Sequence, residues 1–172
     1  MPTRLHPTPT LDELRAREEK WDLHFLGMAH FMGNMSRDPS TRVGSIVTKP
    51  DHTVVSVGFN GFPRSMYDDP ELYANKATKY PRIVHAEMNA ILNAGRSVDG
   101  CTVYVSPIPP CEKCAVFIAQ AGIAKVIAVS PSESVKERWG ESLATALMIF
   151  DDCGITQKLY DVDPASLVKV NP

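Results

Sequence analysis

The sequence lacks long apolar runs, is poor in cysteine and carries almost no net charge. No stretch reaches the roughly 18 apolar residues of a membrane-spanning helix, and the N-terminus has no apolar segment of the kind that directs export. The 172 residues include four cysteines and have a net charge of −2. This charge does not suit a protein that tracks a nucleic-acid polymer, and so few cysteines do not form a disulfide framework. We therefore expect a cytoplasmic protein that acts on a small molecule, with neither a membrane nor a nucleic-acid partner.

Length and hydrophobic pattern predict one domain spanning residues 1–172, with residues 1–20 as an N-terminal extension. The hydrophobic fraction of 44% is enough for one core. Thr10 and Glu13 have the spacing of a capping box that starts a helix. We expect this helix to be interrupted near residues 18–20 and to end at Asp38-Pro39. The patterns predict strands at 43–48, 54–59, 102–106, 125–129 and 155–160, a partly helical flap within 64–82, and helices at 83–93, 111–121 and 139–150. A hairpin followed by alternating strands and helices favours a mixed sheet with helices on both faces.

Two short segments carry the residues of a catalytic metal site. His85-x-Glu87 is followed by Pro110-Cys111-x-x-Cys114. The cysteine spacing directs both thiolates from one helical turn to a common centre, where His85 supplies a third ligand and leaves the fourth tetrahedral position to water, as in catalytic zinc sites. Glu87 is not needed as a ligand and is free to move protons. The combined pattern is the signature of zinc nucleobase deaminases, from which we take the role of Glu87.

Other interpretations of these residues remain open at this point. His85 could be a buried histidine beside two unliganded thiols, or the zinc could be structural with Cys101 or Cys153 as its fourth ligand. We expect Cys101 and Cys153 to be buried small residues instead, because each neighbours glycine at an element boundary. A structural site would have no use for the carboxylate of Glu87.

Beyond the zinc motif, the chain resembles the deoxycytidylate (dCMP) deaminase family of the cytidine deaminase-like superfamily. The similarity extends from about Trp21 to Tyr160. It is carried by the segments Ser36-Arg37-Asp38-Pro39, Val43-Gly44, Val57-Gly58-Phe59-Asn60-Gly61, Lys79-Tyr80-Pro81, His85 to Ile91, Pro110 to Ala115 and Gln120 to Ile123. The resemblance implies a three-layer α/β/α fold around a central mixed five-stranded sheet. It also implies a zinc-dependent hydrolase that converts dCMP to dUMP and ammonia and so feeds thymidylate synthesis.

The resemblance also assigns roles to individual residues. It implies that water adds to C4 of the cytosine, that Glu87 protonates N3 and then the leaving amine, and that the backbone N–H of Ala86 binds the pyrimidine O2. By the same resemblance Asn60 binds the deoxyribose, and Ser36 and Arg37 bind the 5′-phosphate. The planar guanidinium suits phosphate oxygens. Judged from the residues alone, however, Arg37 could be a solvated side chain and Asn60 simple turn chemistry.

Regulation and assembly follow from the resemblance as further expectations. Many members are homohexamers that dCTP activates and dTTP inhibits, and Mg²⁺ can accompany the triphosphate. The effector would bind beside Gly58, Asn60 and Gly61. The flap between Gly61 and Tyr80 is shorter than in some members, and the sequence shows no sign of the second zinc site of some phage members.

Three other functions remain as alternatives to a dCMP deaminase. A deaminase of a free nucleoside or purine base would keep the zinc chemistry without needing Arg37. An RNA-editing deaminase is disfavoured by the acidic balance of the chain. A non-catalytic nucleotide-binding zinc protein would not need Glu87.

Overall fold

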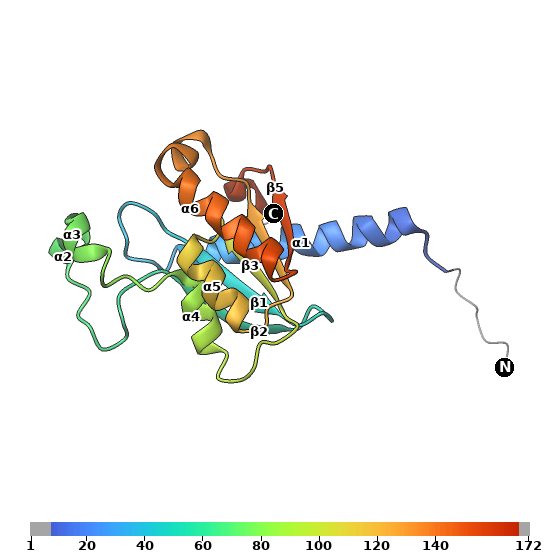
Figure 1. The fold of residues 1–172 in the computed structure, drawn as a ribbon, viewed down its shortest axis with the longest axis horizontal. Coiled ribbons are helices and arrows are strands. Elements are labelled where there is room, and N and C mark those ends of the chain that lie inside the picture. Colours follow the sequence, from blue (N-terminus) through green and yellow to red (C-terminus); the bar gives the residue numbers. More distant parts are fainter. Residues whose placement is uncertain (1–7, 169–172) are drawn as a thin grey trace.

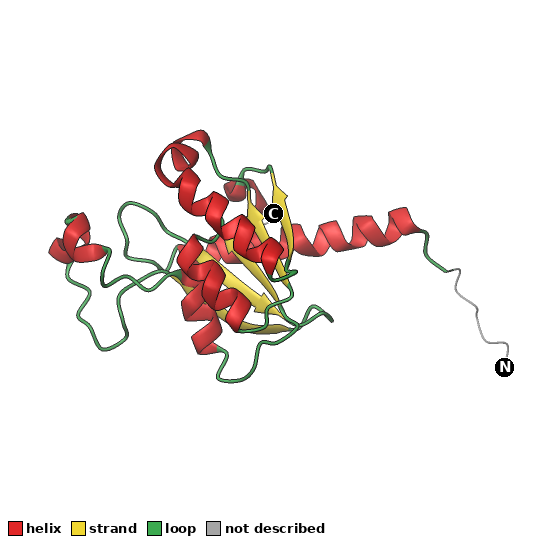
Figure 2. Ribbon diagram, in the orientation of Figure 1, coloured by secondary structure: helices red, strands yellow, loops and turns green. Residues whose placement is uncertain are grey.

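A mixed five-stranded sheet forms the centre of the protein. The computed structural model describes residues 8–168. Its strands are β1 (Gly44–Thr48), β2 (Val54–Phe59), β3 (Thr102–Ser106), β4 (Lys125–Val129) and β5 (Thr156–Tyr160). They lie in the order β2-β1-β3-β4-β5, with β1 antiparallel to β2 and β3, and with β3, β4 and β5 parallel (Figures 1 and 2). The expected mixed sheet of five strands is confirmed, and its predicted bounds agree within one residue.

Helices cover both faces of the sheet, each over a separate apolar cluster. On one face α1 (Leu11–Gly33) packs through Phe25, Leu26 and Ala29 against sheet residues such as Ile127, and the 3₁₀ helix η1 (Pro164–Val168) joins it there. On the other face α4 (Ala86–Asn93), α5 (Glu112–Gln120) and α6 (Glu133–Asp152) enclose the second cluster. The three-layer α/β/α arrangement is therefore confirmed.

Helix α1 begins as predicted but is neither broken nor as long as predicted. The capping box is formed, since the N–H of Glu13 donates to Thr10 Oγ1 (3.2 Å) and the N–H of Thr10 to the Glu13 carboxylate (2.8 Å). The predicted break near residues 18–20 is wrong, because Glu and Lys are good helix formers there. The helix ends at Gly33, before Asp38. Ser36 Oγ and Asp38 Oδ1 accept from nearby backbone N–H groups, which competes with helix formation.

Three other helix starts differ from their predicted positions. His85 and Cys111 have extended backbones (ψ 156° and 171°) and are the N-caps of α4 and α5, so neither lies within its helix. Helix α6 starts at Glu133, well before the predicted start at Trp139. The prediction missed the first turns because they are polar and lack the apolar period that it relied on. The flap is partly helical as expected, with α2 (Pro70–Ala74) and α3 (Lys76–Lys79) standing away from the sheet (Figure 1). Within residues 8–168 no helix is both long and apolar enough to span a membrane.

Candidate active site

The predicted metal ligands come together where the N-termini of α4 and α5 meet. His85 caps α4, Cys111 caps α5 and Cys114 lies in the first turn of α5. His85 Nδ1 lies 3.5 Å from Cys111 Sγ and 3.3 Å from Cys114 Sγ. Because the two helices start here, the positive ends of both helix dipoles and their free N–H groups face the site. This environment stabilises thiolates and other negative charge.

The geometry of these three side chains fits a zinc ion. Their ligand atoms all lie within 4.8 Å of one another. Zn–S bonds of about 2.3 Å and Zn–N bonds of about 2.0 Å at tetrahedral angles place N and S about 3.5 Å apart, close to the observed separations. Among the described residues this is the one group with the spacing of a metal site. Two thiolates and one imidazole are also the donor types that zinc prefers.

Neither of the other cysteines completes a fourfold structural site. Cys101 is buried elsewhere in the apolar core, as predicted. Cys153 is exposed, so the prediction that it is buried is wrong. It is the C-cap of α6, where the chain leaves the helix toward solvent before Gly154. The described part of the chain thus offers three protein ligands, which leaves a coordination position for water.

The two thiols of the site differ strongly in acidity in the metal-free protein. Hydrogen bonds from the Cys114 thiol and from His85 lower the pKa of Cys111 to about 4, against the opposing effect of burial. The same thiol–thiolate hydrogen bond, together with burial, raises the pKa of Cys114. The pKa of His85 is raised, chiefly by its hydrogen bond to Cys111. The two cysteines thus shift in opposite directions, and a metal bound by both thiolates would displace any proton that they hold.

Glu87 is a buried carboxyl beside the ligands but outside their group. Only 3% of its surface is exposed. Burial raises the pKa of Glu87, while the attraction of His85 acts in the opposite direction. A carboxyl with a raised pKa next to a metal-bound water has the acidity that general acid–base catalysis needs. The residues of the predicted motif therefore lie together, while their roles as ligand set and proton carrier stay predictions.

Close packing of α4 on the edge strand β2 fixes the backbone of Ala86. Gly58 makes this packing possible, because a Cβ at that position would lie 2.3 Å from the Ala86 carbonyl oxygen. Asn89 Nδ2 donates to the carbonyl of Phe59 (2.7 Å), and Ser56 Oγ donates to that of Ala90 (2.7 Å). Gly58 is itself buried. It therefore has a packing role here, and its contact with an effector stays a prediction.

The predicted substrate residues lie in a loop held by a polar network. Ser36 is buried, whereas Arg37 is 70% exposed and pairs with Asp68 of the flap at 3.6 Å. Asn60 is buried, and its side chain accepts from the N–H of Val43 (2.8 Å) and donates to the Thr41 carbonyl (2.9 Å). These bonds tie the loop at residues 36–43 to the end of β2. Whether these three residues bind substrate stays a prediction.

The sequence reasoning missed the residues at the centre of this network. Asp38 and Lys79 form a buried ion pair with an Nζ–Oδ1 distance of 3.1 Å. Both positions stood in segments that carried the family resemblance, but no local pattern pairs an acid with a base so far along the chain. The signal that could have found them is their opposite charge, because Asp and Lys are almost never fully buried unless they are paired.

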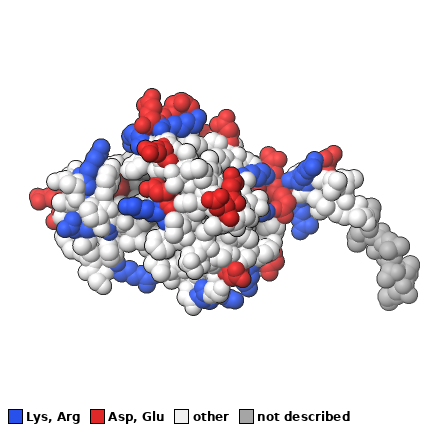
Figure 3. All heavy atoms as spheres, viewed as in Figure 1, with Lys and Arg blue, Asp and Glu red and all other residues white. Residues whose placement is uncertain are grey.

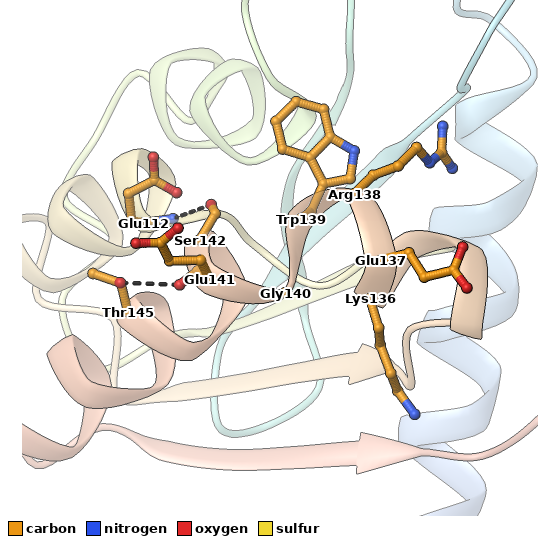
Figure 4. Close-up of a pocket in the computed structure, with 9 residues that line it drawn as sticks. All are labelled: Glu112, Lys136, Glu137, Arg138, Trp139, Gly140, Glu141, Ser142 and Thr145. Atoms are coloured by element: carbon orange, nitrogen blue, oxygen red, sulfur yellow. Dashed lines mark hydrogen bonds between the residues drawn. The ribbon is translucent and has the colours of Figure 1, made fainter.

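A hollow of about 430 Å³ opens on α6 beside the candidate site. Figure 4 shows its wall, formed by Glu112 and by residues 136–142 and 145 of α6. The N–H of Glu112 donates to Ser142 Oγ at 3.4 Å, which joins the start of α5 to α6. Trp139 meets the flap through an edge-on contact with Tyr80, 6.0 Å between ring centroids. On the face seen in Figure 3, charges of both signs are interspersed.

Comparison with known proteins identifies the family. The family "Cytidine and deoxycytidylate deaminase zinc-binding region" matches residues 19–130. A deoxycytidylate deaminase of Homo sapiens is 34% identical over 147 residues, which cover 82% of this chain and 80% of the human protein. An uncharacterised deaminase of Aliivibrio fischeri is 40% identical over 136 residues, which cover 79% of this chain and 90% of that protein.

Solved structures agree on the fold. The dCMP deaminase of cyanophage S-TIM5 in apo form has a TM-score of 0.65 at 21% identity, and the alignment covers 82% of this chain and 98% of the phage chain. A structure of the same enzyme in complex with dCMP and dUMP has a TM-score of 0.62 at 22% identity, covering 90% and 100% of the two chains. By the family match over residues 19–130 and the similarity to the human deoxycytidylate deaminase, the chain belongs to the cytidine and deoxycytidylate deaminase family.

Proposed function

We propose that this protein hydrolyses dCMP to dUMP and ammonia. The observation that carries the proposal is the convergence of His85, Cys111 and Cys114 beside Glu87, which is buried and is not a member of the ligand group. This arrangement occurs in a chain whose relatives include the deoxycytidylate deaminases of Homo sapiens and Mus musculus, at 34% and 36% identity. The donor set supports a hydrolytic zinc enzyme, and the relatives favour the nucleotide.

In this proposal Glu87 moves the protons of the reaction. A zinc ion held by the three ligands would act as a Lewis acid and lower the pKa of a bound water to about 7. The Glu87 carboxylate takes a proton from the nucleophilic water and passes it to N3 of the cytosine as the oxygen adds to C4. Glu87 then takes the proton of the new C4 hydroxyl and delivers it to the amino group, so that the C4–N bond breaks, the C4 carbonyl forms and ammonia leaves. Because the pKa of Glu87 is raised by burial, the same group serves as base and then as acid.

The start of α4 would orient the base. The first intrahelical hydrogen bond of α4 runs from Asn89 N–H to the His85 carbonyl, so the N–H of Ala86 precedes the helical ladder. This N–H would donate to the pyrimidine O2. The close approach of Gly58 to the Ala86 carbonyl holds this residue against β2. The adjacent residues His85 and Ala86 would then bind the metal and the substrate carbonyl, respectively.

The loop at residues 36–43 would recognise the rest of the nucleotide. We propose that Ser36 and Arg37 bind the 5′-phosphate and that Asn60 binds the deoxyribose. Arg37 makes an exposed ion pair with Asp68, and such pairs are weak enough for a phosphate to replace. Replacing Arg37 with alanine should raise the KM for dCMP and leave deoxycytidine turnover almost unchanged. Equal losses on both substrates would contradict the phosphate role.

A substrate panel tests the proposed function directly. The zinc-loaded protein would be incubated separately with dCMP, dCTP, deoxycytidine and guanine while ammonia release is followed. Turnover confined to dCMP supports the proposal. Activity on deoxycytidine or guanine alone would keep the zinc chemistry but replace the substrate, and ammonia release from none of them would favour a binding protein.

We further propose that the enzyme is a cytoplasmic homohexamer in thymidylate precursor synthesis, activated by dCTP and inhibited by dTTP. The triphosphate, with Mg²⁺, would bind beside Gly58, Asn60 and Gly61. The position of Gly61 supports an effect of this site on the active site. Gly61 pairs with Val84, the residue immediately before His85, through two backbone hydrogen bonds with N–O distances of 3.1 and 2.8 Å. Repeating the dCMP assay with each triphosphate, alongside sedimentation analysis, tests both parts. Unchanged rates or a monomer would contradict the corresponding part.

A further inference from the structure

Lys79 is a buried lysine that the chemistry described above does not use. Only 5% of the residue surface is exposed, although lysine is almost never buried unless it is paired. Its partner is Asp38, and the two side chains are 6% and 4% exposed. The pair connects the end of helix α3 in the flap with the loop at residues 36–43. It therefore joins two segments that are far apart in sequence.

Asp38 distributes this contact through the loop. Besides Lys79 Nζ, its Oδ1 accepts from the N–H of Ser40 (2.8 Å) and of Thr41 (3.3 Å), and its Oδ2 accepts from Asn60 Nδ2 (3.4 Å). The N–H of Asp38 in turn donates to Ser36 Oγ at 3.2 Å. The carboxylate thus fixes the backbone that follows Arg37, and the N–H of the same residue holds the Ser36 side chain that precedes it. Without the charge of Lys79, a buried carboxylate at this position would be costly.

The other end of Lys79 leads to the metal site. Its carbonyl accepts from the N–H groups of Arg82 and Ile83, both at 3.0 Å, and so forms the turn that carries the chain to His85. Val84 then pairs with Gly61, the neighbour of Asn60. The backbone of Lys79 holds the approach to the metal ligand, while its side chain holds the loop with Ser36 and Arg37. One residue therefore links the two ends of the proposed substrate site.

We propose that Lys79 is a positioning residue for recognition of the nucleotide 5′-phosphate. Through Asp38 it sets the distance and orientation of Ser36 and Arg37 relative to His85, so that phosphate and base engage together. This inference rests on the proposed function and assigns no chemical step to Lys79. Loss of the contact shifts the phosphate ligands while the zinc ligands keep their places on α4 and α5. Small displacements of a binding group remote from the chemistry are known to cost up to about a hundredfold.

The experiment compares Lys79→Met with Lys76→Met, an exposed lysine in the same short helix. For each zinc-loaded protein, kcat and KM are measured with dCMP and with deoxycytidine, together with zinc content. We expect Lys79→Met to raise the KM for dCMP about tenfold, with deoxycytidine kinetics and zinc content close to wild type. Lys76→Met should match wild type on both substrates.

A double variant keeps the test decisive if Lys79→Met does not fold. Asp38→Asn combined with Lys79→Met removes both buried charges and leaves neither unpaired, while asparagine keeps an acceptor oxygen for Ser40. The same selective rise in KM for dCMP is expected. Equal losses on both substrates, or an unchanged KM for dCMP, would overturn the inference. Wild-type protein that does not turn over dCMP would instead overturn the proposed function before any variant is compared.

Discussion

Two buried carboxylates on opposite faces of the sheet show how differently a protein can use the same group. Asp22 of α1 and Glu87 of α4 are each 3% exposed. Asp22 accepts hydrogen bonds from the hydroxyls of Tyr104 (3.2 Å) and Tyr160 (2.7 Å) and from Lys158 Nζ (3.2 Å). Glu87 instead faces His85 and Cys114, two of the predicted metal ligands. Burial alone therefore does not distinguish a structural carboxylate from a candidate catalytic one, whereas the groups that face the carboxylate differ.

The partners of Asp22 are suited to hold it permanently. Burial raises the pKa of both Tyr104 and Tyr160, and the charge of Asp22 raises these pKa values further. Both phenols therefore keep their protons and remain donors at any physiological pH. The Asp22 network has its bonds satisfied within the protein, as a structural network should. For Glu87, exchange of a proton stays a prediction.

Of the variants that test this comparison, Cys111→Ser should cause the largest loss of activity. It removes a predicted ligand of the zinc ion beside which Glu87 is proposed to act. We expect zinc content to fall to the background and deamination of dCMP to fall at least about a thousandfold, since the Lewis acid is lost. Metal analysis and ammonia release measure both. Cys153→Ser is the matched control, because Cys153 is exposed and should tolerate the change. Retained zinc in the Cys111 variant would remove that residue from the ligand set.

Glu87→Gln should separate proton transfer from metal binding. The variant keeps the shape of the side chain, so zinc content should be unchanged, while kcat should fall by about 10² to 10⁴ because general acid–base catalysis is lost. Thermal stability should not decrease, because the substitution removes a buried group that burial destabilises in its charged form. Glu137→Gln, at an exposed position in α6, serves as control. Undiminished turnover would exclude Glu87 from the mechanism.

Asp22→Ala should have the opposite profile, with a cost in stability and little effect on chemistry. Two buried hydroxyls lose their acceptor, so the free energy of unfolding should decrease by about 3 kcal/mol. At the size of this chain that corresponds to a Tm lower by about 6–12 °C. Zinc content and kcat/KM for dCMP at 20 °C should match those of Asp152→Ala, an exposed control. A stable but inactive Asp22 variant would show that the two faces of the sheet are coupled.

The sequence predicted that His85, Cys111 and Cys114 come together, although their binding of zinc stays a prediction. Cys111 and Cys114 lie within one helical turn, and the deaminase signature joins them to His85 at the start of the preceding helix. These patterns did not anticipate that His85 and Cys111 precede their helices as N-caps. The pairs Asp38–Lys79 and Asp22–Tyr160 escaped prediction altogether, because only tertiary packing brings such distant partners together.

The fold was predicted more accurately in its strands than in its helices. Strand β3 and strand β4 are β-branched runs bounded by turn residues, and their predicted bounds are those of the structure. Helix α6 was underestimated because its polar first turns give no apolar period. The predicted break in α1 reflected missing apolar residues at positions that are exposed and need none. The apolar period of a sequence therefore indicates which part of a helix is buried. It does not detect helical turns that project into solvent.

The two networks differ in how much chain each must close. The contact between His85 and Cys114 closes a loop of 29 residues, whereas the bond between Asp22 and Tyr160 closes one of 138. The loss of chain entropy on closure grows with the logarithm of loop length, so the shorter loop costs about 1.4 kcal/mol less. Chain entropy therefore opposes the meeting of the predicted metal ligands less than it opposes the contact that joins α1 to β5.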